Sequence, residues 1–301
     1  MMARARRSSP ELLGATAALV GVTAVWGSTF VVVKDAIERM AVMDFLAWRF
    51  AIAALVMAAV RPGAVLALTP AARRHGVLLG LALGGGYVAQ TFGLQRTPAT
   101  VSGFITGLFV VFTPLSAGLL LRRRVSSAAW LGVLVATAGL ALLSLHGLSV
   151  GRGEAITLLC ALAFALHIVG LGEWSTPRDA YGLAVVQLAT VAVLSIVVAA
   201  PDTLRPPPDA GVWGAVLLTA LAATALAFFV QTWAQAHLAP TRAAVVMTME
   251  PVFAGVFGVA VGGDHLGVRT VTGALLVLAA MYLVELGPRQ AADATVERLE
   301  T

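Results

Sequence analysis

The sequence predicts an all-α membrane protein whose ten transmembrane helices form two inverted five-helix repeats. Of its 301 residues, 59% are hydrophobic and 12% are charged, about half the charged share of an ordinary soluble domain. So few charges cannot cover the surface of a soluble fold of this size. The apolar residues also fall into ten long blocks, and the second half of the chain repeats features of the first half.

Ten segments are long and apolar enough to cross a bilayer as helices, which takes about 20 residues. The first is an uncharged run of 22 residues, longer than the roughly 7–15 residues of a signal-peptide core. The later spans are separated by short connections, the longest polar one being the proline-rich 200–211. The predicted spans are 12–33, 42–60, 76–94, 99–121, 128–145, 154–171, 181–200, 212–236, 243–262 and 268–286.

The distribution of Lys and Arg predicts the orientation, because cytoplasmic loops carry an excess of both residues. With the N-terminus inside, the inner segments carry 13 of these residues and the outer loops carry 6, while Arg49 lies within a span. Both termini are therefore expected in the cytoplasm, with 1–11 and 287–301 as tails. The run 122–124 would lie inside, and Asp264 and His265 would lie outside.

An ungapped shift of 141 positions lays Gln90 on Gln231 and Thr100 on Thr241. The repeats would be 12–145 and 154–286. Each repeat has five spans, an odd number, so the two copies must point in opposite directions across the membrane. Inverted repeats of this kind are a transporter architecture, with the substrate site near the midplane where the halves meet.

Four stretches resemble the ten-helix EamA-type branch of the drug/metabolite transporter superfamily: AVWGSTFVVVKDAI at 24–37, AWRFAIAAL at 47–55, GFITGLFVVFTPL at 103–115 and MEPVFAGVFG at 249–258. The resemblance covers residues 12–286 and implies secondary transport, often the export of amino acids or other small metabolites. Many relatives carry Gly-Glu-Arg after the fourth and ninth helices. Here these positions read Arg-Arg-Arg at 122–124 and Gly-Asp-His at 263–265, which puts an acidic role at Arg123 in doubt.

Two charged side chains within spans have two interpretations each, because ionisable groups in a bilayer usually face a cavity or a partner. Glu250 either titrates a proton or binds a substrate amine, or it is a structural carboxylate hydrogen-bonded between helices. Arg49 either clamps a substrate carboxylate or snorkels past Asp44 to the membrane interface.

Further polar residues within spans are candidates for the substrate pathway, although each would also serve to hydrogen-bond neighbouring helices. Pro114 and Pro251 are expected to bend their helices; Pro251 deprives the Met247 carbonyl of its usual donor. The candidate pathway residues, with Arg49 and Glu250, are Trp26, Thr29, Tyr87, Gln90, His167, Gln187 and Gln231.

The sequence contains no recognisable catalytic set, phosphate-binding loop or metal-ligand spacing, so neither an enzyme nor a cofactor is expected. It has no dense basic tract for nucleic acid, and its single Cys160 excludes an internal disulfide. We expect a secondary transporter, an exporter of a small metabolite, amino acid or amphipathic compound, working by alternating access in the inner membrane. Its partners would be this substrate, membrane lipid and, as a candidate coupling ion, the proton; the chain would be a monomer or homodimer. The alternative is a membrane scaffold or lipid-interacting protein without a transport cycle.

Overall fold

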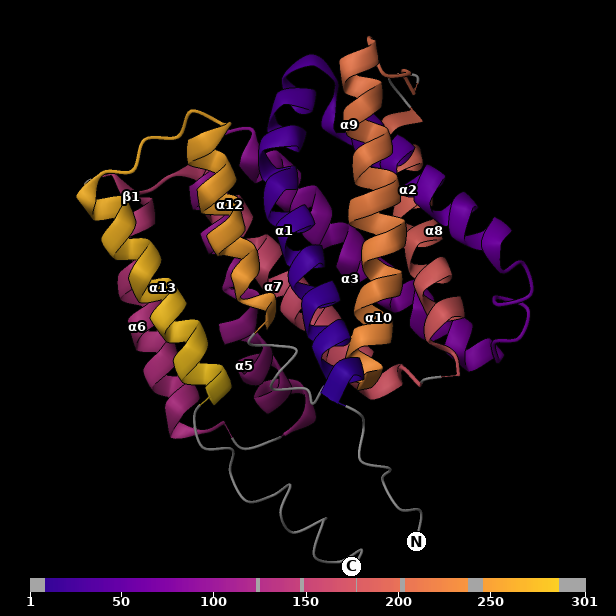
Figure 1. The fold of residues 1–301 in the computed structure, drawn as a ribbon, viewed down its shortest axis with the longest axis horizontal. Helices are drawn as coiled ribbons and strands as arrows, with labels where there is room; N and C mark the ends of the chain where they lie inside the picture. Colours follow the sequence, from indigo (N-terminus) through magenta and orange to yellow (C-terminus); the bar gives the residue numbers. More distant parts are fainter. Residues whose placement is uncertain are drawn as a thin grey trace, which may run out of the picture.

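The computed structural model is a bundle of apolar helices (Figure 1) and describes residues 9–122, 125–146, 149–176, 178–200, 204–237 and 246–286. Two two-residue strands, β1 (Leu145–His146) and β2 (Ser149–Val150), pair antiparallel between the two halves. The helical elements are α1 (Ser9–Arg39), α2 (Val42–Val60), α3 (Pro70–Leu94), α4 (Ala99–Gly107), α5 (Phe109–Leu121), α6 (Ser127–Ser144), α7 (Arg152–Trp174), α8 (Ala180–Ala199), α9 (Ala210–Ala220), the π-helical segment η2 (Leu221–Leu226), α10 (Ala227–His237), α12 (Met249–Ala260) and α13 (Val268–Leu286).

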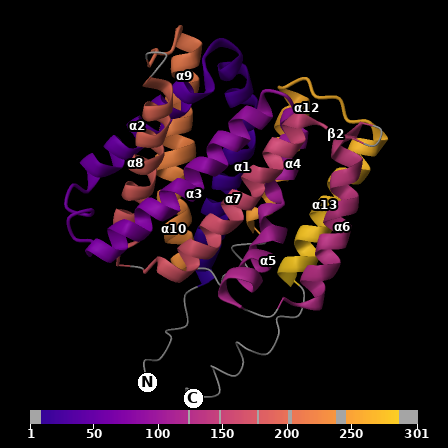
Figure 2. The same cartoon turned by 180° about the vertical axis from the view of Figure 1, so that it is seen from behind.

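These elements confirm the all-helical membrane fold. Seven helical segments are long and apolar enough to cross a membrane, and three shorter apolar helices, at Ser127–Leu143, Met249–Ala260 and Val268–Val284, complete the set in the described part of the chain. Each of the ten expected spans coincides with one of these segments, although 243–245 of the ninth span lie outside the described residues. The first turn of α1 and the last turn of α13 lie at the same end of the bundle (Figures 1 and 2), as an even number of crossings requires.

Helices from the two halves of the chain pack closely against one another, α1 against α12 and α3 against α7 and α8 (Figure 2). The α1–α12 contact depends on Gly27. A Cβ atom at Gly27 would lie 2.5 Å from the Cβ of Phe253 and 2.7 Å from the backbone nitrogen of Ala254. Apolar side chains gain nothing by leaving lipid for one another, so helices in a membrane associate through close van der Waals packing. A small residue at the contact allows the two backbones to approach this closely.

The span 99–121 is interrupted rather than continuous. Its backbone tightens at Leu108, whose amide donates to the Ile105 carbonyl at 3.1 Å, while the Val111 amide donates to the Leu108 carbonyl at 2.9 Å. Pro114 lies inside α5 and cannot donate to the carbonyl four residues earlier. The departure from α-helix therefore falls within two turns before the proline.

The ninth span is interrupted just before Pro251. Val246 and Met247 are helical, Thr248 forms a turn and α12 starts at Met249, so Pro251 lies three residues after the turn. A proline fits the first turn of a helix because its missing N–H would have no helical partner there. The bend expected at Pro251 stays a prediction.

Two contacts fix the start of α4. The Asp264 carboxylate accepts a hydrogen bond from the Thr100 amide at 2.8 Å, and Lys34 Nζ donates to the Thr97 carbonyl at 2.6 Å. Asp264 therefore lies at the start of the 99–121 span, whereas Arg122 lies at its other end. This placement supports the expectation that the two sites face opposite sides of the membrane.

Candidate functional site

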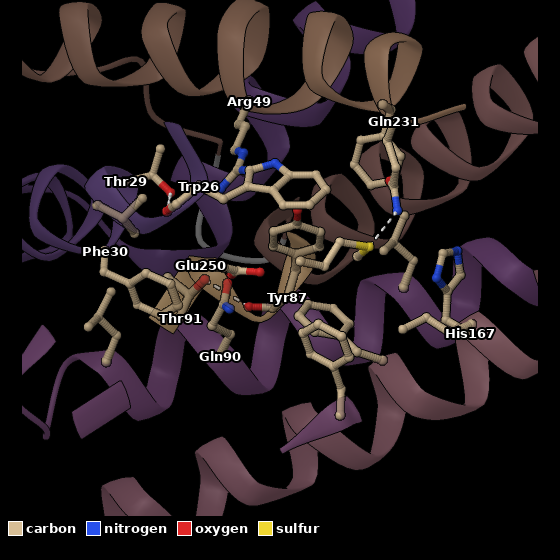
Figure 3. A pocket seen from close by; sticks show the side chains of 18 residues that line it. Trp26, Thr29, Phe30, Arg49, Tyr87, Gln90, Thr91, His167, Gln231 and Glu250 are labelled. Atoms are coloured by element: carbon tan, nitrogen blue, oxygen red, sulfur yellow. Dashed lines mark hydrogen bonds between the residues drawn. The ribbon is translucent and has the colours of Figure 1, made fainter. Parts of the chain in front are cut away.

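A cavity of about 770 Å³, counting its part open to solvent, lies among helices from both halves of the chain (Figure 3). Its walls come from α1, α2, α3 and α5 in the first half and from α7, α10, Met247 and α12 in the second. Most of the lining is apolar, and aromatic rings are frequent. The aromatic members, apart from His167, are Trp26, Phe30, Tyr87, Phe109, Phe164 and Phe228.

Arg49 is the cation of this lining and is only 3% exposed. Its Nε donates to Thr224 Oγ1 at 2.9 Å, and its Cζ lies 4.8 Å from the centroid of the Tyr87 ring and 5.3 Å from that of Phe50. An arginine held in this way does not snorkel to the interface, so the structure excludes that interpretation. Within the described part of the chain, no carboxylate lies within ion-pair distance of its guanidinium group.

The π-helical segment η2 positions two cavity residues at once. Besides holding Arg49 through Thr224, it accepts a hydrogen bond from Trp26 Nε1 at the Ala223 carbonyl, at 2.8 Å. π-Helical turns are rare and often occur at functional sites, because their altered register changes where backbone groups point. Thr224 was missed among the candidates, since a threonine among alanines and leucines carries no distinguishing pattern.

Glu250 enters the cavity from the wall opposite Arg49 (Figure 3) and is 8% exposed. It lies in the first turn of α12, where the positive end of the helix dipole favours a carboxylate. Among the described residues its carboxylate makes no hydrogen bond, so the interpretation of a purely structural carboxylate bonded between helices receives no support here.

His167 is held by a residue outside the cavity. Its Nε2 lies 2.6 Å from Gln187 Oε1, and Gln187 Nε2 donates to the Leu183 carbonyl at 3.1 Å. Because Gln187 already uses its amide nitrogen, its oxygen must accept from His167 Nε2–H. In the neutral ring, Nδ1 is then an acceptor on a residue that lines the cavity.

The remaining predicted residues are more loosely held. Gln90 Nε2 lies 3.4 Å from Thr106 Oγ1, and Gln231 Nε2 lies 3.9 Å from the Met247 sulfur (Figure 3). The Thr29 hydroxyl bonds the carbonyl of Trp26 in its own helix, at 2.6 Å. The structure therefore brings eight of the nine predicted pathway residues to one cavity, while Gln187 lies behind it. The phenylalanines of the lining were missed, because an apolar residue in a span gives no sign of facing a cavity.

A multi-pass helical bundle that encloses a partly polar cavity between its halves is typical of a membrane transporter. The chain matches the EamA-like transporter family twice, over residues 12–145 and 151–286. It belongs to that family and is a multi-pass membrane transporter.

Proteins similar to this chain bear the same description. An "Uncharacterized transporter" of Archaeoglobus fulgidus is 34% identical over 265 residues, which cover 88% of this chain and 83% of that protein. The "Uncharacterized inner membrane transporter YedA" of Escherichia coli K12 is 25% identical over 92% of both chains. A crystal structure with 19% sequence identity covers 96% of this chain and 99% of its own, with a TM-score of 0.61, which shows the shared fold.

Proposed function

We propose that this transporter is a secondary carrier that exports a small metabolite, amino acid or amphipathic compound across the inner membrane, and that the central cavity is its substrate site. The observation that carries the proposal is the convergence of polar side chains from both halves on one hollow. Polar groups within a bilayer are costly unless they serve a partner or a cavity. A scaffold without a transport cycle would pair them with each other and leave no such space.

We further propose that the two halves are inverted repeats, which would give the cavity a route to both sides. Rocking of one half against the other around a fixed central site would expose it alternately to either side. The inner-membrane location is supported by the description of the Escherichia coli relative. Glu250 is the proposed proton-titrating group, with Arg49, Tyr87 and His167 as the other titratable groups around the same cavity.

Transport into proteoliposomes, measured by mass spectrometry over a panel of metabolites with and without a pH gradient, tests the proposal. Thr29→Phe should fill the cavity and abolish movement of any transported compound, because Thr29 lines it. The control, Thr137→Phe, places the same ring on the exposed face of α6 and should transport normally. Normal transport by a folded Thr29→Phe protein would show that the cavity is not the route.

The proposed role of Glu250 in coupling transport to protons is tested by a separate substitution in the same assay. Glu250→Gln keeps the shape of the side chain and removes its proton site. If the proton is the coupling ion, this variant should fold, transport, and lose the dependence of the rate on pH. An unchanged pH profile would assign coupling to another group.

Sidedness is tested separately. Single cysteines at 122 and 265, in a Cys160→Ser background, should react with an impermeant thiol reagent from opposite sides, with 122 cytoplasmic. Labelling of both from one side would refute the inverted arrangement.

A further inference from the structure

A buried cation without an anion next to it is the least expected feature of the cavity. Isolated charges are costly to bury, and natural proteins pair them with an opposite charge or place them where a ligand supplies one. Arg49 is 3% exposed, lines the cavity, and has no carboxylate of the described residues within ion-pair distance. Glu250 lines the same cavity but makes no such pair (Figure 3).

We infer that Arg49 binds the carboxylate of the substrate, and that the substrates are small organic monoacids with an apolar, preferentially aromatic, body. The inference rests on the proposed function, since it names the class of compound that this cavity carries.

The geometry of the guanidinium group favours a carboxylate. Thr224 holds its Nε, and the ring of Tyr87 packs beside its Cζ, so that the orientation of the plane is set before a ligand arrives. A planar carboxylate matches the spacing of the terminal amino groups with two parallel hydrogen bonds.

The charges of the cavity favour a single negative group. The lining contains one guanidinium and one carboxyl group, Arg49 and Glu250. A dicarboxylate or a phosphate dianion would bring a second negative charge towards Glu250 with no second cation to receive it. A monoacid avoids this repulsion.

The rest of the lining fits an apolar body. Tyr87 packs edge-to-face on Phe50 and on Phe164, with centroid separations of 4.8 Å and 5.3 Å. Trp26 and Phe228 pack edge-to-face at 6.2 Å, with Trp26 fixed by its bond to the Ala223 carbonyl. These rings present rigid apolar surface, on which an aromatic substrate gains contact without ordering flexible side chains.

Three ligands of matched size separate the role of charge: 3-phenylpropionate, 3-phenylpropionamide and 3-phenylpropylamine. Binding to the purified full-length protein in detergent is measured by thermal stabilisation over a concentration series. Wild-type protein should be stabilised by the acid at millimolar concentration, and the amide and the amine should bind about tenfold more weakly or not at all, since each lacks the charge-assisted bonds to Arg49. Absence of stabilisation by the acid, or equal binding of the amide or amine, would overturn the inference.

Substitutions test whether Arg49 is the group that prefers the acid over the amide and the amine. Arg49→Gln should lose the preference for the acid, whereas Arg74→Gln, which removes an exposed cation of α3, should retain it. If Arg49→Gln does not fold, Thr224→Val should weaken binding of the acid relative to the amide, because it frees the guanidinium plane. An unaltered preference in Arg49→Gln, or in Thr224→Val where that variant stands in for it, would place the carboxylate elsewhere and refute the inference.

The outcomes for the two proposals differ. Acid that binds but is not moved in proteoliposomes would leave the carboxylate site standing and refute the transport function. Transport of amines or neutral compounds only, blocked by Thr29→Phe, would support the transport function and refute the carboxylate site.

Discussion

The central cavity and a second hollow between α4, α12 and α13 have opposite linings. The central one contains charged, amide and aromatic side chains from both halves. The second is lined by valine, leucine and other small or apolar residues, with Thr100 and Thr270 as its polar members, and its Val256 and Leu275 are 56% and 61% exposed. Such exposed apolar residues on a membrane protein face lipid. The presence of a hollow alone therefore does not favour a region as the substrate site, whereas the convergence of polar groups favours the central cavity that we propose.

The two regions also differ in how their polar groups are bonded. At the centre, Arg49 and Trp26 donate to a different helical segment, η2. On the perimeter, Thr137 and Thr272 bond carbonyls of their own helices, at Val133 and Val268. Lipid offers no hydrogen bonds, so a perimeter group must be satisfied locally. Arg49 and Trp26 instead bond across helices and fix how those helices lie, although Thr29 at the centre bonds a carbonyl of its own helix. Matched substitutions in the two regions test this difference.

The largest effect is expected from Gly27→Ala, at the α1–α12 contact. The added methyl group would meet backbone atoms as well as Phe253, at 2.5–2.8 Å, and backbone cannot yield as a flexible side chain can. We expect a loss of about 3 kcal/mol of stability, the upper end for overpacking, seen as a lower melting temperature in detergent.

Gly85→Ala is the perimeter control. A Cβ at Gly85 meets nothing within 4 Å, and alanine is favoured over glycine within a helix by about 0.5–1 kcal/mol. This variant should melt slightly higher than wild type. Equal melting of the two variants would mean that α1 and α12 separate freely and that the centre is no tighter than the perimeter.

The next effect in size is expected from Thr224→Val. It preserves shape but leaves Arg49 Nε without its acceptor in a buried site, at a cost of about 2 kcal/mol. Thr224→Ser should restore most of the stability, because the hydroxyl returns. Thr137→Val, on the exposed face of α6, should change stability by less than about 0.5 kcal/mol. If Thr224→Val were as mild as Thr137→Val, the bond to Arg49 would not contribute to the fold.

A smaller effect, about 1 kcal/mol, is expected from Trp26→Phe. The change keeps an aromatic ring but removes the donor to the Ala223 carbonyl, a single neutral hydrogen bond. Trp130→Phe is its control, since Trp130 is 57% exposed on α6, and it should be close to neutral. Thermal melting in the same detergent measures both, and a milder result at Trp26 than at Trp130 would contradict the comparison.

The sequence predicted the spans well because hydropathy and length are local properties of the chain. Eight of the nine candidate residues named from the sequence, Tyr87 and Gln231 among them, line one cavity, because a polar residue in a lipid-length segment is conspicuous. The sequence did not predict what depends on partners in space. Arg49 had two equal interpretations until the η2 segment placed Thr224 beside it. The turn at Thr248 was not predicted, because it has no local signal that distinguishes it from a continuous apolar span.

The smallest effect is expected from removing the charge of Asp209, whose ion pair with Arg39 links the start of α9 to α1 and is exposed to water. At the start of α9, the Asp209 carboxylate accepts from the Val212 amide at 2.9 Å and pairs with Arg39 of α1 at 2.9 Å, while Arg39 also pairs with Asp35. These contacts, the Val212 amide first and then Arg39, lower the pKa of Asp209 below its usual 3.8. Exposed ion pairs of this kind contribute little and are screened by salt.

The stabilisation contributed by the Asp209 carboxylate depends on pH, because the pKa of this group differs between the folded and the unfolded protein. Because the pKa is lower in the folded protein, the stabilisation is complete above the unfolded value near 3.8 and is lost as the pH falls through the folded value. Asp209→Asn keeps a helix-capping side chain and removes the charge. It should melt slightly below wild type at neutral pH, less so in high salt, and the difference should vanish at acidic pH, where Asp209 is itself uncharged. Asp209→Ala lacks the cap as well, so its deficit should persist in acid. An Asp209→Asn deficit that stays constant down to acidic pH would show that the charge contributes nothing, and that this end of the bundle is held, like the perimeter, by contacts within each helix.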